Sequence, residues 1–264
     1  MLQKPKQLGP EYAAAFQDQS VATAYVHRAP YSLEVYAKLR ELIVDEPRNV
    51  LELGCGPGEI SRTLAPEVDR VDAVDPSEAM IEVGRGLSNG DHPDLNWHIS
   101  SAEEFSYDAT YSIILTPESL GWLDWEVVFP KMRLALSPHG RLVVLMRGHN
   151  ASWDADTLDG IVPHYSTNVD FAPYDLIGEL EKDGLFVVED RVTTQPVPVS
   201  QSIDDYIEFW HSRSGFSRER MGTQQAERFD DEVRKLLLLH STNEMLRYDA
   251  VVHIVWGVPG PTAA

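Results

Sequence analysis

The stretch Val50-Leu51-Glu52-Leu53-Gly54-Cys55-Gly56-Pro57-Gly58-Glu59 decides the fold. Its first four residues are typical of the end of a buried strand, and residues 59–64 are typical of the start of a helix. The turn between them carries three glycines. A strand, a glycine-rich turn and a helix form a common ligand site in open α/β sheets, because glycine permits a left-handed backbone and close approach of a ligand.

The spacing of these glycines indicates which class of ligand the turn can bind. A dinucleotide site requires Gly-x-Gly-x-x-Gly, but the third position falls on Glu59 when counted from Gly54 and on Ser61 when counted from Gly56. The Gly-Lys-Ser/Thr ending of a phosphate-binding loop is also absent. Glu52 stands two residues before the first glycine, and a carboxylate there favours a ligand with a cationic end.

The pattern Glu-x-Gly-x-Gly-x-Gly at 52–58 resembles the first motif of the class I S-adenosylmethionine-dependent methyltransferases. This resemblance implies an α/β fold, a Rossmann-like seven-stranded mixed sheet with helices on both faces. Its seventh strand is antiparallel and lies between the fifth and the sixth. The sequence predicts the seven strands at 50–53, 70–75, 95–99, 111–116, 141–146, 185–189 and 248–256.

Asp75 ends the predicted strand 70–75, 21 residues after Gly54. α/β nucleotide-binding folds place a carboxylate on the ribose hydroxyls at about this interval, and an ionised carboxylate accepts hydrogen bonds from both of them. An ordinary turn or helix cap is the alternative. The resemblance implies S-adenosylmethionine as cofactor and S-adenosylhomocysteine as product. It implies that the cofactor contacts are Glu52, Gly54, Cys55, Gly56, Gly58, Asp75, Pro76, Met80, Ala102, Glu103 and Thr116.

Composition limits the partners. The 264 residues include 42 acidic and 22 basic side chains, and a net charge of −20 repels nucleic acid and anionic membranes. Cys55 is the single cysteine, and the nine histidines show no metal-binding spacing, so no metal site is expected. The chain has neither a signal-peptide pattern nor 18 consecutive apolar residues, so we expect a cytoplasmic protein without a membrane span. The oligomeric state stays open.

The predicted organisation is a single methyltransferase domain over residues 1–264. Residues 1–10 read as a loose tail and 11–25 as a helix, and 147–172 is irregular enough to form a substrate loop. The parts are N-terminal helices over the site at 1–48, a cofactor-binding core at 49–194, a helical cap insertion at 195–247, and the last strand and tail at 248–264.

The predicted reaction is methyl transfer to an O or N atom of a small molecule by in-line displacement. Arg28 or Arg213 would favour an anionic substrate if either faced the pocket, because guanidinium binds carboxylates bidentately. No catalytic base is identified. Candidate substrate contacts or bases, each with an ordinary structural explanation as well, are Tyr25, His27, Arg28, Tyr31, Glu118, Trp122 and His211.

Two positions depart from the family pattern. Ser112 stands where relatives often have Asp, and Gly121-Trp122 stands where the trans-aconitate methyltransferase branch commonly has His-Trp. A non-catalytic nucleoside-binding relative therefore remains an alternative. A nicotinamide-dependent oxidoreductase is the other, although the glycine spacing argues against it.

Overall fold

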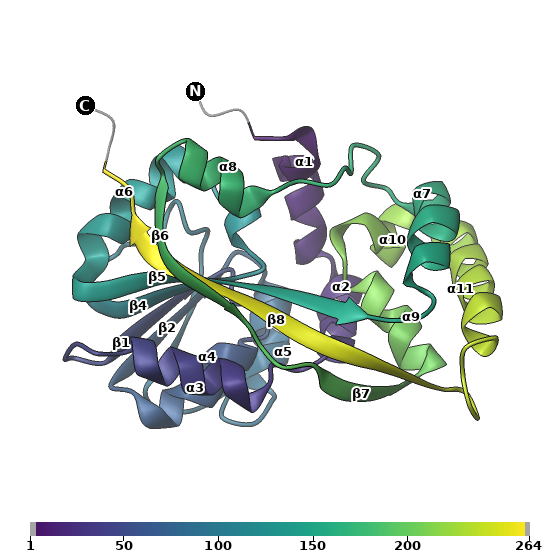
Figure 1. Cartoon of the computed structure of the whole chain (residues 1–264), viewed down its shortest axis with the longest axis horizontal. Helices are drawn as coiled ribbons and strands as arrows, with labels where there is room; N and C mark the ends of the chain where they lie inside the picture. The colour runs from purple at the N-terminus through teal and green to yellow at the C-terminus, as the bar shows by residue number, and fades with distance from the viewer. Residues whose placement is uncertain (1–3, 262–264) are drawn as a thin grey trace.

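The computed structural model describes residues 4–261, without the side chains at 158 and 159, around one mixed sheet (Figure 1). Parallel pairs join β2 to β3, β1 to β2, β1 to β4 and β4 to β5, and β8 pairs antiparallel with β5, β6 and β7. The order is β3-β2-β1-β4-β5-β8-β6, with β7 also on β8. The strands are β1 (Asn49–Leu53), β2 (Arg70–Asp75), β3 (Leu95–Ile99), β4 (Tyr111–Pro117), β5 (Leu136–Asn150), β6 (Phe186–Thr193), β7 (Val197–Ser202) and β8 (Met245–Pro259).

This topology confirms the Rossmann-like prediction, including an antiparallel last strand between β5 and β6. The prediction of seven strands was one short, because β8 begins at Met245 and its early part pairs with β7. Pro198 lies in β7, which pairs only with β8, and proline is tolerated on such an edge strand because it cannot donate a ladder hydrogen bond.

Helices cover both faces of the sheet. On one face, α3 (Leu33–Leu42) and α4 (Glu59–Leu64) pack apolar side chains on β1, β2 and β4. On the other face, α6 (Trp125–Ala135) and α8 (Leu176–Lys182) pack on the same strands and on β5. The helix α5 (Glu78–Arg85) follows β2, and the short turns η4 (Ala65–Glu67) and η5 (Leu120–Trp122) follow α4 and β4. Burial on both faces explains why the central strands are nearly all apolar.

The N-terminal segment is ordered, so the predicted loose tail was wrong for residues 4–10, while residues 1–3 lie outside the described range. Gln7 is buried because its backbone oxygen accepts from Asn168 and its side-chain oxygen accepts from the amide of Ala172. The predicted helix at 11–25 is broken at Asp18, which has an extended backbone and bonds Ser217 and Arg220. The segment consists of η1 (Lys6–Leu8), α1 (Pro10–Ala13), η2 (Ala14–Gln17), α2 (Gln19–Ala24) and η3 (Tyr25–His27).

A second hydrophobic cluster lies at the far end of β5 and β8, where the later helices gather (Figure 1). It contains Trp153, Tyr206, Trp210 and Phe229, all buried. Its elements are η6 (Asp156–Ile161), α7 (Val162–Tyr165), α9 (Ile203–His211), η7 (Ser214–Phe216), α10 (Arg218–Met221) and α11 (Thr223–Leu238). The fifth strand was predicted to end at residue 146, but β5 continues to Asn150 because β8 pairs with it along this extension. Within residues 4–261, no helix is both long and apolar enough to cross a bilayer.

Candidate functional site

The glycine turn connects β1 to α4 in a left-handed backbone, with φ of +69° at Gly54 and +55° at Gly56. A Cβ on Gly54 would lie 2.4 Å from Cβ of Ser119, so only glycine lets this turn pack on the segment after β4. Ser119 also donates a hydrogen bond of 2.5 Å to the backbone oxygen of Leu53. The turn and the chain after β4 are therefore in direct contact at one edge of the sheet.

Asp75 fixes the glycine turn to the end of β2. Its Oδ2 accepts from the amide of Gly56 and its Oδ1 accepts from the amide of Ser77, both at 2.8 Å. Burial raises the pKa of this carboxyl to about 6. Each oxygen keeps a second lone pair, so the group can still accept from a ligand.

Glu52 is almost fully buried and holds the start of α4. Its Oε2 accepts from both the amide and the hydroxyl of Ser61. Burial raises the pKa of Glu52 to about 8. These contacts give Glu52 a structural role in the fold, and its contact with a cationic ligand stays a prediction.

The side chains predicted beside the adenine gather near α5. Met80 is buried against Val21 and Ala22 of α2, so the N-terminal segment covers this part of the sheet edge. Ala102 is also buried, whereas Pro76 is exposed. Three other predicted cofactor contacts already have neighbours within the protein. Glu103 accepts a hydrogen bond from the amide of Asp124, and the buried Cys55 thiol contacts the backbone oxygen of Gly56. A Cβ on Gly58 would meet the ring of Trp97.

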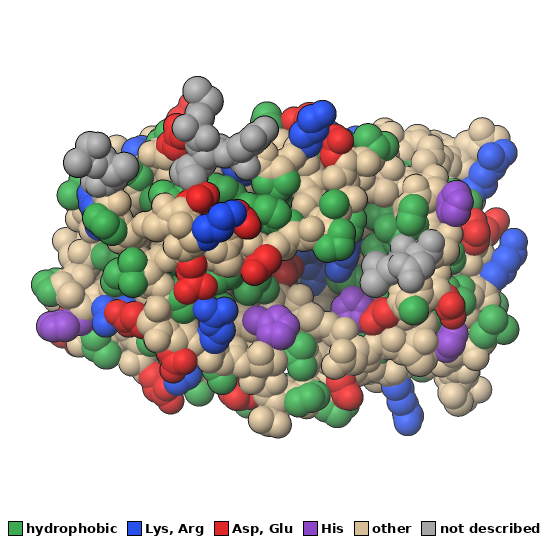
Figure 2. All heavy atoms as spheres, turned by 45° about the horizontal axis from the view of Figure 1, so that its top comes forward, with side chains coloured by type: hydrophobic (Ala, Val, Ile, Leu, Met, Phe, Trp, Pro, Cys, Tyr) green, Lys and Arg blue, Asp and Glu red, His purple; other side chains and the backbone are tan. Residues whose placement is uncertain are grey.

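A cavity of about 470 Å³ opens beyond the carboxyl ends of β4 and β5. Ligands sit at this edge in open α/β sheets. Residues 116, 144, 146–149 and 250–252 line it from the sheet, residues 118 and 120–122 line it from the chain after β4, and residues 206, 209, 210 and 213–216 line it from α9 and η7. On the face shown in Figure 2, hydrophobic side chains surround a hollow in which Lys or Arg atoms are visible. The hydroxyl of Thr116 lines the cavity and is buried without a hydrogen-bond partner among the described residues.

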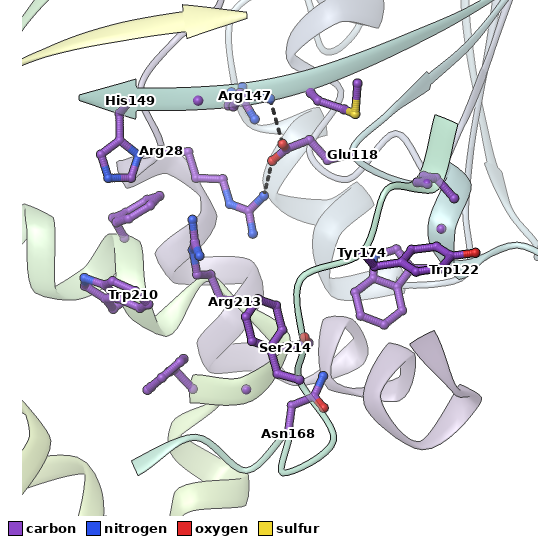
Figure 3. A pocket seen from close by; sticks show the side chains of 18 of the residues that line it. Arg28, Glu118, Trp122, Arg147, His149, Asn168, Tyr174, Trp210, Arg213 and Ser214 are labelled. Carbon is purple, nitrogen blue, oxygen red and sulfur yellow. Dashed lines mark hydrogen bonds and ion pairs between the residues drawn. The ribbon is translucent and has the colours of Figure 1, made fainter. Parts of the chain in front are cut away.

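Glu118 lies between two arginines in this cavity (Figure 3). Its Oε2 accepts from Nη1 of Arg28 at 3.0 Å, and its Oε1 accepts from the backbone amide of Arg147 at 2.8 Å. Arg147 directs its guanidinium to Glu59 at 2.5 Å. Arg28 also donates to the hydroxyl and the backbone oxygen of Ser212, so both guanidinium groups are held in fixed positions.

Only some of the candidate substrate residues reach the cavity. Arg28, Glu118 and Trp122 line it, and Trp122 packs edge-on against Phe16 at 5.4 Å between ring centroids. Tyr25 instead lies over the glycine turn, 3.6 Å from the position of a Cβ on Gly56.

The other candidates, Tyr31, His27 and His211, are not part of the cavity lining. Tyr31 is buried, with the Arg147 guanidinium 3.8 Å above its ring. The ring of His27 pairs with Asp205. His211 fits the structural explanation given for it above, because its fully buried ring bonds the backbone oxygen of Phe216 and the carboxylate of Asp230.

Several cavity residues were not among the individual site candidates, namely the aromatic residues of α9 and also Arg147 and His149, which begin the predicted substrate loop 147–172. His149 bonds Asp154 at 3.0 Å and packs edge-on against Phe209 and Tyr248. The run Phe209-Trp210 before Arg213 was the available signal, since it places aromatic side chains beside a cation on one helix end. Among the described residues, no group of three or more His, Cys, Asp or Glu side chains is arranged to hold a metal ion.

Comparisons with known proteins agree with this geometry. Residues 50–140 match a family model described as a methyltransferase domain. The chain is 24% identical to malonyl-[acyl-carrier protein] O-methyltransferase 1 of Ilyobacter polytropus over 136 residues, which cover 50% of each protein. It is 28% identical to trans-aconitate 2-methyltransferase of Streptomyces coelicolor over 130 residues, 47% of this chain and 42% of the relative. The chain thus spans about half the length of the curated relatives it matches.

Solved structures support the fold. A protein from Anaeromyxobacter dehalogenans, provisionally named a type II methyltransferase, superposes with a TM-score of 0.62 at 20% identity and covers 89% of this chain and 99% of its own. The motif at 52–58, the strand order and the family model matched by residues 50–140 lead to one conclusion: these residues form a methyltransferase domain with the fold of the class I S-adenosylmethionine-dependent enzymes.

Proposed function

We propose that this protein transfers a methyl group from S-adenosylmethionine to an O or N atom of a small molecule bound in the 470 Å³ cavity. The observation that carries the proposal is the contact between Gly54 and Ser119, because Ser119 meets the glycine turn while Glu118 and Leu120, on either side of it, line the cavity. A cofactor on the glycine turn would thus adjoin an acceptor in the cavity.

The strand ends fit this cofactor chemically. Asp75 offers free lone pairs for ribose hydroxyls, and the left-handed turn at Gly56 presents backbone rather than side chain. The Thr116 hydroxyl has no hydrogen-bond partner among the residues that the structure describes. Met80 and Ala102 supply apolar surface for a purine. Tyr25 now covers Gly56, so its ring has to lie against the cofactor or move aside when the cofactor binds.

The cofactor supplies a methyl group on a sulfonium, which is already activated for displacement. The acceptor lone pair forms the new bond to carbon as the carbon–sulfur bond breaks, and the electrons of that bond remain on sulfur in the thioether product. The chain has to align the acceptor and exclude water, and alignment alone supplies about 7–11 kcal/mol of barrier reduction. Arg28, Glu118 and Trp122 are the residues we assign to alignment, since they line the cavity beside residue 119.

Two of the relatives are named for the acceptor that they methylate, and one of these names specifies an oxygen atom. One is named as an O-methyltransferase of malonyl-[acyl-carrier protein] and the other as a trans-aconitate methyltransferase. The cavity volume of about 470 Å³ is within the range of small-molecule sites.

A binding measurement and a turnover measurement together test the proposal. S-adenosylhomocysteine should raise the melting temperature of the purified protein, whereas NADH should not. With S-adenosylmethionine and a panel of small acids, phenols and amines, at least one acceptor should produce S-adenosylhomocysteine. Stabilisation by NADH alone would indicate an oxidoreductase, and nucleoside binding without turnover on any acceptor would indicate the non-catalytic alternative.

A further inference from the structure

Arg213 places a positive charge in the cavity wall without an anionic partner. Its guanidinium makes no hydrogen bond or ion pair with the described residues, although other arginines of the cavity make several. Instead it lies over the rings of Phe209 and Trp210, 4.9 and 4.8 Å from their centroids. A flat cation held on aromatic faces keeps its N–H donors free at its edge.

The carboxylates near Arg213, of which Glu118 and Asp154 raise its pKa, are bonded to other groups. Glu118 is paired with Arg28 and Glu59 with Arg147, so the two carboxylates around the cavity are already matched by two arginines. Asp154, the next acid, bonds His149 and the amide of Ala151. Burial lowers the pKa of Arg213, and the nearby charge of Arg28 lowers it further.

An arginine without a paired carboxylate among the described residues is unexpected in a chain with 42 acidic and 22 basic side chains. Almost any surface position would offer such an arginine a carboxylate. A partly buried cation without a partner is costly, so the cost is usually offset by binding an anion. Guanidinium binds planar oxyanions such as carboxylates with two parallel hydrogen bonds.

Aromatic and aliphatic side chains form much of the cavity wall beside Arg213, together with polar residues such as Gln7, Asn168 and Ser214. Phe16, Leu8 and Trp122 line one side, and Phe209, Trp210 and Phe216 line the other. Figure 3 shows Arg213 reaching into the space between Trp210 and Arg28, with Trp122 and Tyr174 across from it. A ligand that matches these walls has an apolar body and a single anionic group, since the other arginines of the lining, Arg28 and Arg147, are already paired with Glu118 and Glu59.

We infer that the methyl acceptor is an apolar monocarboxylate whose carboxylate group pairs with Arg213. This inference rests on the proposed function, because it identifies the occupant of the same cavity. It excludes molecules with several carboxylates, since Arg213 is the cation of the described cavity lining that lacks a counter-ion.

Calorimetric titration of the S-adenosylhomocysteine-loaded protein tests the inference. The probes are cinnamate and indole-3-acetate, their primary amides, and trans-aconitate as a tricarboxylate. At least one monocarboxylate should bind the wild type about tenfold or more tighter than its amide and than trans-aconitate. Arg213→Met keeps the apolar stem, and it should reduce monocarboxylate affinity about ten- to a hundredfold while amide affinity stays within about twofold.

The control is Arg191→Met, which changes an arginine of β6 that pairs with Glu181 outside the cavity lining, and it should bind all probes as the wild type does. The inference would be overturned if the wild type bound acids and amides equally, or bound trans-aconitate more tightly than the monocarboxylates. It would also be overturned if neither monocarboxylate bound at millimolar concentration, or if Arg213→Met kept the wild-type selectivity. The affinity for S-adenosylhomocysteine is measured separately in every variant, so failure of the cofactor assignment is recognised independently.

Discussion

Glu118 accepts a hydrogen bond from Arg28, with 3.0 Å between Oε2 and Nη1, while its own backbone is left-handed with φ of +57°. The pair joins the N-terminal segment to the end of β4 at the edge of the cavity. A left-handed backbone costs a residue other than glycine about 1–2 kcal/mol. Such strain persists where the surrounding contacts hold the residue in place, which is common at binding sites.

Replacing Glu118 by alanine or by glycine separates the backbone strain from the ion pair. Both variants remove the carboxylate and should lose most turnover, but Glu118→Ala should be about 1 kcal/mol less stable than Glu118→Gly in urea unfolding, because only glycine relieves the strain. The control is Asn89, which is exposed with φ of +61°. Its alanine and glycine variants should show the same difference with normal turnover. Equal stability of the two Glu118 variants would contradict the strain argument.

Local patterns predicted the part of the fold that holds the cofactor motifs. β2 and β3 have the predicted bounds, and Asp75 does reach the glycine turn, since its Oδ2 accepts from the Gly56 amide. These elements are short, and each is marked by residues next to it in the sequence. A buried strand followed by glycine or an acid is a signal that needs no knowledge of distant contacts.

The cavity was harder to predict because its walls come from distant parts of the chain. The last residues of β5, 147–150, are Arg-Gly-His-Asn, and this polar run lacks the apolar pattern of a core strand. The side chains of Arg147 and His149 line the cavity. Gln7 looked like part of a tail, since its partners lie more than 150 residues away. Arg213 has no counter-ion among the described residues. This could not be predicted from the spacing of residues in the sequence, because it depends on where the carboxylates of distant segments lie in the fold.

Asp75 provides a test of the ribose assignment. Asp75→Ala should weaken S-adenosylhomocysteine binding about tenfold or more, because hydrogen bonds to a charged acceptor are lost. Burial raises the pKa of Asp75 to about 6, so wild-type affinity should rise between pH 5 and 7 as the carboxyl ionises, and this rise should disappear in Asp75→Asn. Asp91→Asn, an exposed acid, is the control. Calorimetry that found wild-type affinity in Asp75→Ala would refute the ribose contact.

Glu52 should make the protein less stable as the pH rises. Its pKa is raised by burial from 4.5 in the unfolded chain to about 8 in the fold, so the folded state binds more protons between these values. The stabilising contribution is complete below pH 4.5 and is lost as the pH passes 8, at up to about 1.4 kcal/mol per pH unit. In urea unfolding at pH 5 to 9, Glu52→Gln should show a shallower slope, whereas the exposed Glu104→Gln should match the wild type. If the unfolding free energies of the wild type and Glu52→Gln changed equally with pH, Glu52 would not be the source of the pH dependence.

Gly56 and Gly184 form a matched pair for the glycine turn. Both have a left-handed backbone, with φ of +55° and +69°, but a Cβ on Gly184 meets open space while one on Gly56 meets the ring of Tyr25 at 3.6 Å. Each alanine variant should lose about 1–2 kcal/mol of unfolding free energy from the backbone. Only Gly56→Ala should also weaken binding of S-adenosylhomocysteine, and Gly56→Val should abolish it, because a side chain there occupies the surface on which we place the cofactor. If titration showed that Gly56→Ala and Gly184→Ala bind S-adenosylhomocysteine with equal affinity, the cofactor would have to lie away from Gly56.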